Sequence, residues 1–167
     1  YIITIIDFSK TSNLKRLWTI DLKDMRIIHN TYVAHGRNSG NEFAKAFSNT
    51  PNSYKSSLGF YITAETYYGK HGFSLRLDGV EPNINHNARK RAIVMHGANY
   101  VSEDFIKKYG RLGRSFGCPS VPMGEHEEII DSIKEGSILF IYYPDNQYEL
   151  ASKLLTAPTD QLPDRGL

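Results

Sequence analysis

Seven short segments rich in β-branched and aromatic residues, each bounded by turn-forming residues, restrict the fold of this chain more than any other feature. Such side chains fit a pleated, half-buried surface, so the segments predict β-strands. They span residues 1–6, 16–22, 25–29, 58–63, 73–77, 92–96 and 137–143. Lys23-Asp24, between the second and third segments, predicts a tight hairpin. The chain is therefore expected to be mainly β.

Helical patterning is confined to residues 42–48, 102–109 and 125–135. Ser102 suits an N-cap and Gly110 a C-terminal stop for the second segment. The third segment places three isoleucines on one side and acidic residues in its first turn, as an amphipathic helix does. We expect these last two helices to pack on the sheet, which predicts an α+β fold in which strands dominate.

Chain length and charge limit the number of domains and the kinds of partner that this chain can have. At 167 residues, 40% of them hydrophobic, the chain can form one compact domain without disulfides. We expect this domain at residues 1–155 and a surface tail at 156–167, which holds two prolines and few apolar residues. The net charge of +2 comes from 20 basic and 18 acidic residues scattered along the chain, so charge indicates no nucleic-acid or membrane partner. No oligomeric state is indicated.

The sequence also carries no recognisable targeting or membrane segment. No apolar run reaches the roughly 18 residues that predict a membrane span. Residues 1–7 are too short for a signal peptide. Because the chain starts within a predicted strand, we expect that upstream residues are processed away or lie outside this sequence.

Cys118 is the only cysteine and lies in the motif Arg114-Ser115-Phe116-Gly117-Cys118-Pro119. Gly117 lets the backbone approach a substrate closely, and Pro119 restricts the chain just after the sulfur. Arg114 supplies positive charge, which favours the reactive thiolate. This context indicates a catalytic thiol, although a lone cysteine is often only a small buried hydrophobe.

His96 is the candidate base for that thiol. It ends an apolar run, is followed by Gly97 and lies 22 positions before Cys118, so the two side chains can meet only through tertiary structure. At the end of a strand its ring would lie at the rim of the sheet, with the Gly97 carbonyl fixing its tautomer. Backbone N–H groups of Gly117 and Cys118 could then form an oxyanion hole.

Other candidate sites are weaker. The remaining histidines form no close metal-ligand pair, so no metal site is predicted. The tyrosines between residues 54 and 68, Tyr68 among them, indicate either core packing or a sugar- or peptide-binding cleft. The glycine-rich residues 34–40 lack the Gly-Lys-Ser/Thr end of a phosphate loop, which argues against nucleotide binding.

The assembled motifs resemble the catalytic domain of the L,D-transpeptidases, bacterial cell-wall enzymes also called YkuD-like domains. Those enzymes carry His-Gly, a gap, and then Ser/Thr-His-Gly-Cys, and here His96-Gly97 and Ser115-Phe116-Gly117-Cys118 occupy these places. The resemblance covers about residues 1–145 and implies a mixed β-sheet sandwich or barrel. Phe116 stands where the family has a second histidine, and Ser120 where it has a longer polar residue.

The resemblance also implies roles. Cys118 would attack a peptide carbonyl, His96 would take the thiol proton, Gly97 would orient His96, and Gly117 would contribute to the oxyanion hole. The further residues expected to contact substrate are Arg114, Ser115, Phe116 and Tyr68. For Arg114, four residues before Cys118, two roles stay open: it replaces positive charge lost with the second histidine, or it binds a substrate carboxylate. Donor and acceptor would be peptidoglycan stem peptides outside the cytoplasm, in the periplasm or cell wall, with no cofactor or metal.

The residues themselves leave open two alternatives to a transpeptidase. If water outcompetes amines at the thioester, the same site is an L,D-carboxypeptidase or another cysteine peptidase or amidase. A non-catalytic wall-binding module could retain the fold, but it would leave the thiol, the His-Gly pair and the arginine unexplained.

Overall fold

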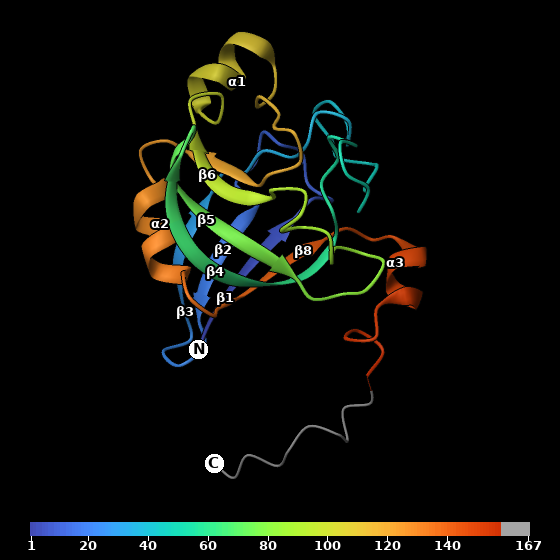
Figure 1. The fold of residues 1–167 in the computed structure, drawn as a ribbon. Helices are drawn as coiled ribbons and strands as arrows, with labels where there is room; N and C mark the ends of the chain where they lie inside the picture. Colours follow the sequence, from blue (N-terminus) through green and yellow to red (C-terminus); the bar gives the residue numbers. More distant parts are fainter. Residues whose placement is uncertain (158–167) are drawn as a thin grey trace.

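The structure is a computed structural model that describes residues 1–157 (Figure 1). The strands are β1 (Ile2–Asp7), β2 (Leu17–Asp21), β3 (Arg26–Thr31), β4 (Gly59–Gly69), β5 (Gly72–Gly79), β6 (Val94–Ala98), β7 (Ser120–Pro122) and β8 (Ile138–Tyr142). The helices are α1 (Glu103–Tyr109), α2 (His126–Ile133) and α3 (Asn146–Ala151). Within the described residues, no helix is both long and apolar enough to cross a membrane. The expected mainly β class is confirmed.

All eight strands join one mixed sheet in the order β3-β2-β1-β8-β4-β5-β6-β7. The β1–β8 and β6–β7 pairs are parallel, and the other pairs are antiparallel. Beyond β3 the chain returns to the opposite end of the sheet, where the Ala34 N–H donates to the Ser120 carbonyl of β7 at 2.8 Å. The sheet therefore nearly closes into a barrel, as the family resemblance implied.

The core lies inside the curved sheet and against α2. Strand residues that point inward alternate with outward ones, and the inward set includes Ile6, Tyr61, Leu77 and Ile141, all almost fully buried. Helix α2 packs its buried isoleucines against β1, β5 and β6, although three strands separate β1 from β6 in the sheet order. One short helix can touch strands so far apart only because the sheet curls around it.

Each of the seven predicted strands is present, and the hairpin at Lys23-Asp24 joins β2 to β3. The lengths differ most in β4 and β5, which extend to a tight hairpin at Lys70-His71, where Gly69 pairs with Gly72. Strand β6 also runs past its predicted end, so His96 lies in its middle rather than at its end. The short strand β7 and helix α3 were not predicted.

The helix predicted at residues 42–48 is wrong. Those residues are irregular because their backbone N–H groups find partners in neighbouring loops rather than four residues back along the chain. The N–H groups of Lys45 and Ala46 both donate to the Ser39 carbonyl, and that of Ser48 donates to Ser56. These contacts with neighbouring loops override the local preference of the residues for a helix.

Helix α1 confirms its predicted ends but not its predicted packing. The Ser102 hydroxyl accepts the Phe105 N–H at 3.1 Å, and Gly110 ends the helix with φ of +77°. No residue of α1 is buried; Ile106 only packs partly against a small cluster that includes Leu112. The third predicted helix is present as α2, a few residues shorter than expected, and does pack on the sheet.

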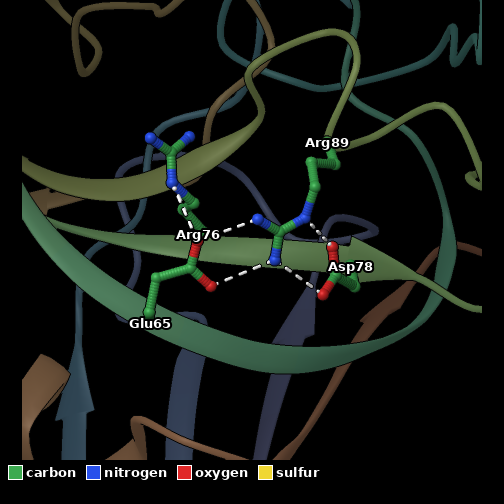
Figure 2. Close-up of polar contacts among 4 residues, drawn as sticks. All are labelled: Glu65, Arg76, Asp78 and Arg89. Atoms are coloured by element: carbon green, nitrogen blue, oxygen red, sulfur yellow. Dashed lines mark hydrogen bonds and ion pairs between the residues drawn. The ribbon is translucent and has the colours of Figure 1, made fainter.

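An ion-pair cluster braces the hairpin of β4 and β5 (Figure 2). Arg89 donates from two nitrogens to Glu65, at 2.8 and 3.1 Å, and from two to Asp78, at 2.5 and 2.9 Å. Arg76 joins through Nε, 3.1 Å from Glu65, and its guanidinium lies 4.2 Å from the ring centroid of Tyr67. The cluster thus connects both strands to the segment that leads into β6.

This cluster predicts a pH-dependent contribution to stability. Hydrogen bonds from Arg89 lower the pKa of Glu65 from 4.5 to about 2. Because the folded-state pKa lies below the unfolded one, the contribution is present above pH 4.5 and is lost as the pH falls towards 2. Glu65→Gln should therefore melt below the parent at pH 6 and converge with it near pH 2.

The check is thermal denaturation of the parent and Glu65→Gln across that pH range. Glu128→Gln, at an exposed position without an ion pair in the described part of the chain, is the matched control and should track the parent. A difference in melting temperature between the parent and Glu65→Gln that stays constant down to pH 2 would contradict the assigned role of Arg89.

Of the predicted surface tail at 156–167, residues 158–167 lie outside the described residues. Residues 156–157 are a bend that follows α3.

Candidate active site

Ser115 holds the turn that carries Cys118. Its hydroxyl accepts the Gly117 N–H at 3.1 Å and donates to the Cys118 carbonyl at 2.6 Å. Gly117 has φ of +121°, and a Cβ there would lie 2.8 Å from the Lys55 carbonyl oxygen, so a side chain would be strained and crowded. The turn therefore needs glycine, because the backbone approaches another part of this chain closely.

Cys118 lines a cavity of about 350 Å³ and is partly exposed there. Its Sγ accepts the Val94 N–H at 3.4 Å and donates to the Ala92 carbonyl at 3.5 Å. Besides Ala92 and Val94, the residues that line this thiol cavity with Cys118 are Tyr67, Lys70, His71, Arg91, His96, Tyr100, Arg114, Ser115 and Phe116. The thiol is therefore held beside the start of β6 and open to a ligand.

His96 lines the same cavity from the middle of β6. Its Nδ1 lies 2.9 Å from the Gly97 carbonyl, and a carbonyl can only accept, so Nδ1 carries the proton and Nε2 is the acceptor. Nε2 accepts the Ser120 hydroxyl at 3.1 Å, and this hydroxyl also lies 3.0 Å from the Tyr100 hydroxyl. Among the described residues no hydrogen bond joins His96 to Cys118. Burial lowers the pKa of His96, which favours the neutral ring at pH 7.

Two cations partly offset the rise in the pKa of Cys118 that burial causes. Burial raises the pKa of Cys118, while the Val94 N–H and then the charges of Arg91 and Lys70 act in the opposite direction. Arg91 is fixed behind the cavity by four hydrogen bonds to the loop of residues 48–57. The sequence had assigned this electrostatic role to Arg114, and the structure gives it to Arg91 and Lys70 instead.

Arg114 has a different set of contacts. Its Nη1 donates to the carbonyls of Arg37, at 3.1 Å, and Gly40, at 3.2 Å, and to Asn41 Oδ1 at 2.9 Å. These bonds tie the loop that contains residues 37–41 to the segment that carries the thiol. The Arg37 N–H reinforces the contact by donating to the Ser115 carbonyl at 2.7 Å.

Phe116 is 58% exposed at the edge of the thiol cavity. Its ring contacts Tyr54, with the ring centroids 4.7 Å apart, and the Arg37 guanidinium lies 6.0 Å from its centroid. A phenyl ring at this position offers an apolar surface to a ligand and no proton-transfer group. Titratable chemistry beside the sulfur therefore has to come from other residues.

Tyr68 does not join the thiol cavity. It is 81% exposed, packs on Phe73 and lines a neighbouring cavity of about 550 Å³. Successive side chains of a strand point to opposite sides, so it is Tyr67 that lies in the thiol cavity. His71, Lys70 and Tyr100 line both cavities and separate them.

Several cavity residues were missed by sequence reasoning. Lys70 and His71 occupy the tip of the β4–β5 hairpin, and the His71 ring stacks on His96 with the centroids 4.2 Å apart. The glycines on either side of this pair are a turn signal that could have located the tip. For Arg91 and Tyr100 the sequence holds no comparable signal, because only the path of the chain brings them to the cavity.

Removing the positive charge of Arg91 should slow the reaction of the Cys118 thiol. Arg91→Gln is expected to raise the pKa of Cys118 further, and each unit of increase lowers the thiolate fraction at neutral pH about tenfold. We expect alkylation by iodoacetamide at pH 7 to slow roughly threefold to tenfold, measured as a full rate–pH profile.

Two variants control that measurement. Arg91→Lys keeps the charge and should keep most of the rate, which separates the electrostatic effect from lost loop contacts. Arg114→Gln should leave the alkylation profile in place, because Arg114 does not act on the thiol charge. A profile that shifts in Arg114→Gln and not in Arg91→Gln would reverse the assignment.

Similarity to solved structures defines the class of this domain as the L,D-transpeptidase fold. An L,D-transpeptidase from Mycobacterium smegmatis is 9% identical, with 85% of this chain and 58% of that chain covered and a TM-score of 0.53. L,D-transpeptidase 3 from Mycobacterium tuberculosis is 10% identical, with 85% and 61% covered and a TM-score of 0.53. The helical cell shape determining protein Pgp2 from Campylobacter jejuni is 13% identical, with 87% and 48% covered and a TM-score of 0.52.

The chain belongs to the L,D-transpeptidase catalytic-domain family, whose profile matches residues 1–142. This chain spans only about half to three-fifths of the length of the solved relatives. No curated protein matches the sequence.

Proposed function

We propose that this domain is a cysteine-dependent peptidoglycan L,D-transpeptidase. Its donor is a stem tetrapeptide, and it cleaves the bond between the third-position diamino acid and the terminal D-alanine. The observation that carries the proposal is that Cys118 and His96, far apart in sequence, line one cavity, with His96 fixed in the tautomer that leaves Nε2 basic. Family membership supports an enzyme of this kind.

Acylation begins with proton transfer from the Cys118 thiol to His96 Nε2. The sulfur attacks the carbonyl carbon of the diamino acid, and a tetrahedral oxyanion forms. When the C–N bond breaks, His96 gives the proton to the leaving nitrogen, so D-alanine departs with a neutral amine. The acyl group stays on Cys118 as a thioester. For this transfer the Ser120 hydroxyl must release Nε2, which it holds in the unliganded cavity.

Deacylation repeats these steps in reverse. An acceptor amine gives a proton to His96 Nε2 as its nitrogen attacks the thioester carbon, and the sulfur leaves and regains a proton from His96. If water takes the place of the amine, the product is the free tripeptide, and the domain acts as an L,D-carboxypeptidase.

The oxyanion donor we assign is the Cys118 N–H. Within the described residues this N–H has no hydrogen-bond partner, whereas the Gly117 N–H is occupied by the Ser115 hydroxyl. Gly97 then acts by holding Nδ1, Ser115 by holding the turn, and Phe116 by offering an apolar wall. Tyr68, in the neighbouring cavity, is a candidate for contact with the acceptor.

The organisation of the protein follows from this proposal. Residues 1–155 form the catalytic unit, and because the substrate lies in the cell wall, the domain works outside the cytoplasm. Both partners are stem peptides.

The test uses a disaccharide-tetrapeptide with the purified protein and mass spectrometry of both protein and products. The proposal expects a tripeptide adduct on Cys118, release of D-alanine and a cross-linked dimer. Tripeptide without dimer would assign hydrolysis instead. Unchanged substrate, with no adduct at any time, would contradict the enzyme and favour a binding module.

A further inference from the structure

A second cavity adjoins the thiol cavity and is lined by arginines. It measures about 460 Å³, and its walls are Arg37, Tyr100, Phe105, Arg111, Gly113, Arg114 and Phe116. Tyr100, Arg114 and Phe116 also line the thiol cavity. The two cavities therefore meet at these three side chains.

The three arginines, Arg37, Arg111 and Arg114, form a cluster of positive charge that no acidic group among residues 1–157 pairs with. None of them makes an ion pair within the described residues, unlike Arg76 and Arg89 on the β4–β5 hairpin. Besides burial, the charges of Arg111 and Arg37 lower the pKa of Arg114, which places both near its guanidinium. Like charges gathered at one cavity are unfavourable unless an anion joins them.

Within residues 1–157, most guanidinium donors of this arginine cluster have no hydrogen-bond partner. Arg114 uses only Nη1 for the loop carbonyls, and Arg111 uses only Nη1, to the Leu112 carbonyl at 2.8 Å. Arg37 makes no side-chain hydrogen bond in the described residues and is exposed. Guanidinium groups match carboxylates in geometry and bind them through two parallel hydrogen bonds.

The chemistry of the proposed reaction supplies such a carboxylate. The residue that leaves the donor is C-terminal, so its carboxylate carbon lies only about 3–4 Å from the carbonyl carbon that Cys118 attacks. Arg114, four residues before Cys118, lines both the thiol cavity and the second cavity.

We propose that the arginine cluster is a carboxylate-binding subsite for the residue that leaves the acyl donor, and that it directs the enzyme to bonds one residue from a free C-terminus. This inference rests on the proposed function and adds the group that the site recognises. An internal carboxylate of the donor has the same chemistry, and the experiment separates the two sources.

The experiment compares three tetrapeptide donors: one with free carboxylates, one with a C-terminal amide, and one with only its internal carboxylates amidated. The readout is kcat/KM for formation of the Cys118 adduct, measured by mass spectrometry. The parent should prefer the free C-terminal carboxylate over the C-terminal amide by about tenfold or more, because a charge-assisted bidentate contact is lost.

Arg37→Gln/Arg111→Gln should lower kcat/KM about tenfold for the free donor and leave it unchanged for the C-terminal amide, so the preference collapses. This pair spares the loop contacts of Arg114, and iodoacetamide alkylation of Cys118 should match the parent. Lys107→Gln/Lys108→Gln on α1 removes the same charge outside the cavity and should keep the preference.

Three results would overturn the subsite. These are equal rates for the free and C-terminally amidated donors, a preference that survives in Arg37→Gln/Arg111→Gln, and a loss that follows amidation of the internal carboxylates instead. Adduct formation still occurs in all three cases, so the proposed function stands. Absence of any adduct from every donor would instead sink the proposed function, and the subsite with it.

Discussion

Cys118→Ala is expected to abolish D-alanine release from the tetrapeptide, with a loss of at least roughly 10³-fold, because no other group in the thiol cavity can form the thioester. The side chain is small, and its Sγ makes only weak contacts with Val94 and Ala92, so the fold should remain intact. The measurement is D-alanine release together with the intact mass of the protein, which should show no adduct.

The affinity for the tetrapeptide donor shows whether Cys118→Ala loses catalysis or loses substrate binding. If the domain is an enzyme, Cys118→Ala should still bind tetrapeptide with an affinity close to that of the parent, as measured by calorimetry, while turnover is lost. Cys118→Ser keeps the shape of the site with a poorer nucleophile and should also be nearly inactive. D-alanine release by Cys118→Ala at the rate of the parent would eliminate the thiol mechanism.

His96→Gln is expected to lower kcat/KM about 10²–10⁴-fold, the usual contribution of a general base. The structure also predicts the pH profile of the parent. Because burial lowers the pKa of His96, the ring stays neutral until the pH falls below its ordinary value of 6.5, and activity should decline only there. In His96→Gln this acidic limb should disappear along with most of the turnover.

The matched control for that variant is His29→Gln. His29 contacts Ser132 and does not line the thiol cavity, so activity and pH profile should stay those of the parent. Alkylation of Cys118 at high pH should survive in His96→Gln, since a thiolate formed by solvent needs no base. Unchanged turnover in His96→Gln would mean that another group takes the thiol proton.

The electrostatics of the site explain why both effects should be large. The thiol is desolvated, and Arg91 and Lys70 only partly offset the rise in its pKa. A thiol that is mostly protonated at pH 7 depends on a base at the moment of attack. A neutral His96 with a free lone pair on Nε2 is suited to that task, once the Ser120 hydroxyl has moved away.

Strands could be predicted well from the sequence, and loop structure poorly. Short runs of β-branched and aromatic side chains mark β1 and β8 regardless of what surrounds them, because such side chains favour extended backbone and burial. Residues 42–48 show the opposite case, since a short stretch with helical preference was pulled into loop contacts with Ser39 and Ser56. Strand β7 is only three residues long and too short to leave a pattern.

Some residues of the candidate site could also be predicted from the sequence, and others could not. The Cys118 motif and the His96-Gly97 pair can be recognised from the sequence because the strained turn before the sulfur needs glycine and because His96-Gly97 interrupts an apolar run. Arg91, Lys70 and Tyr100 have no local signature, since their role depends on which part of the chain passes behind the sulfur. For the same reason Arg114 was credited with the charge that Arg91 supplies.

The sequence by itself determined the chemical groups available and the strands that carry them, because residue type and alternation are local properties. Only the tertiary structure decided which groups share a cavity, which cation faces the thiol, and that three arginines with no acidic partner in the described part of the chain gather at the adjoining cavity. Burial, distance and the sum of charges at a point arise when remote segments meet, and no single stretch of chain encodes them.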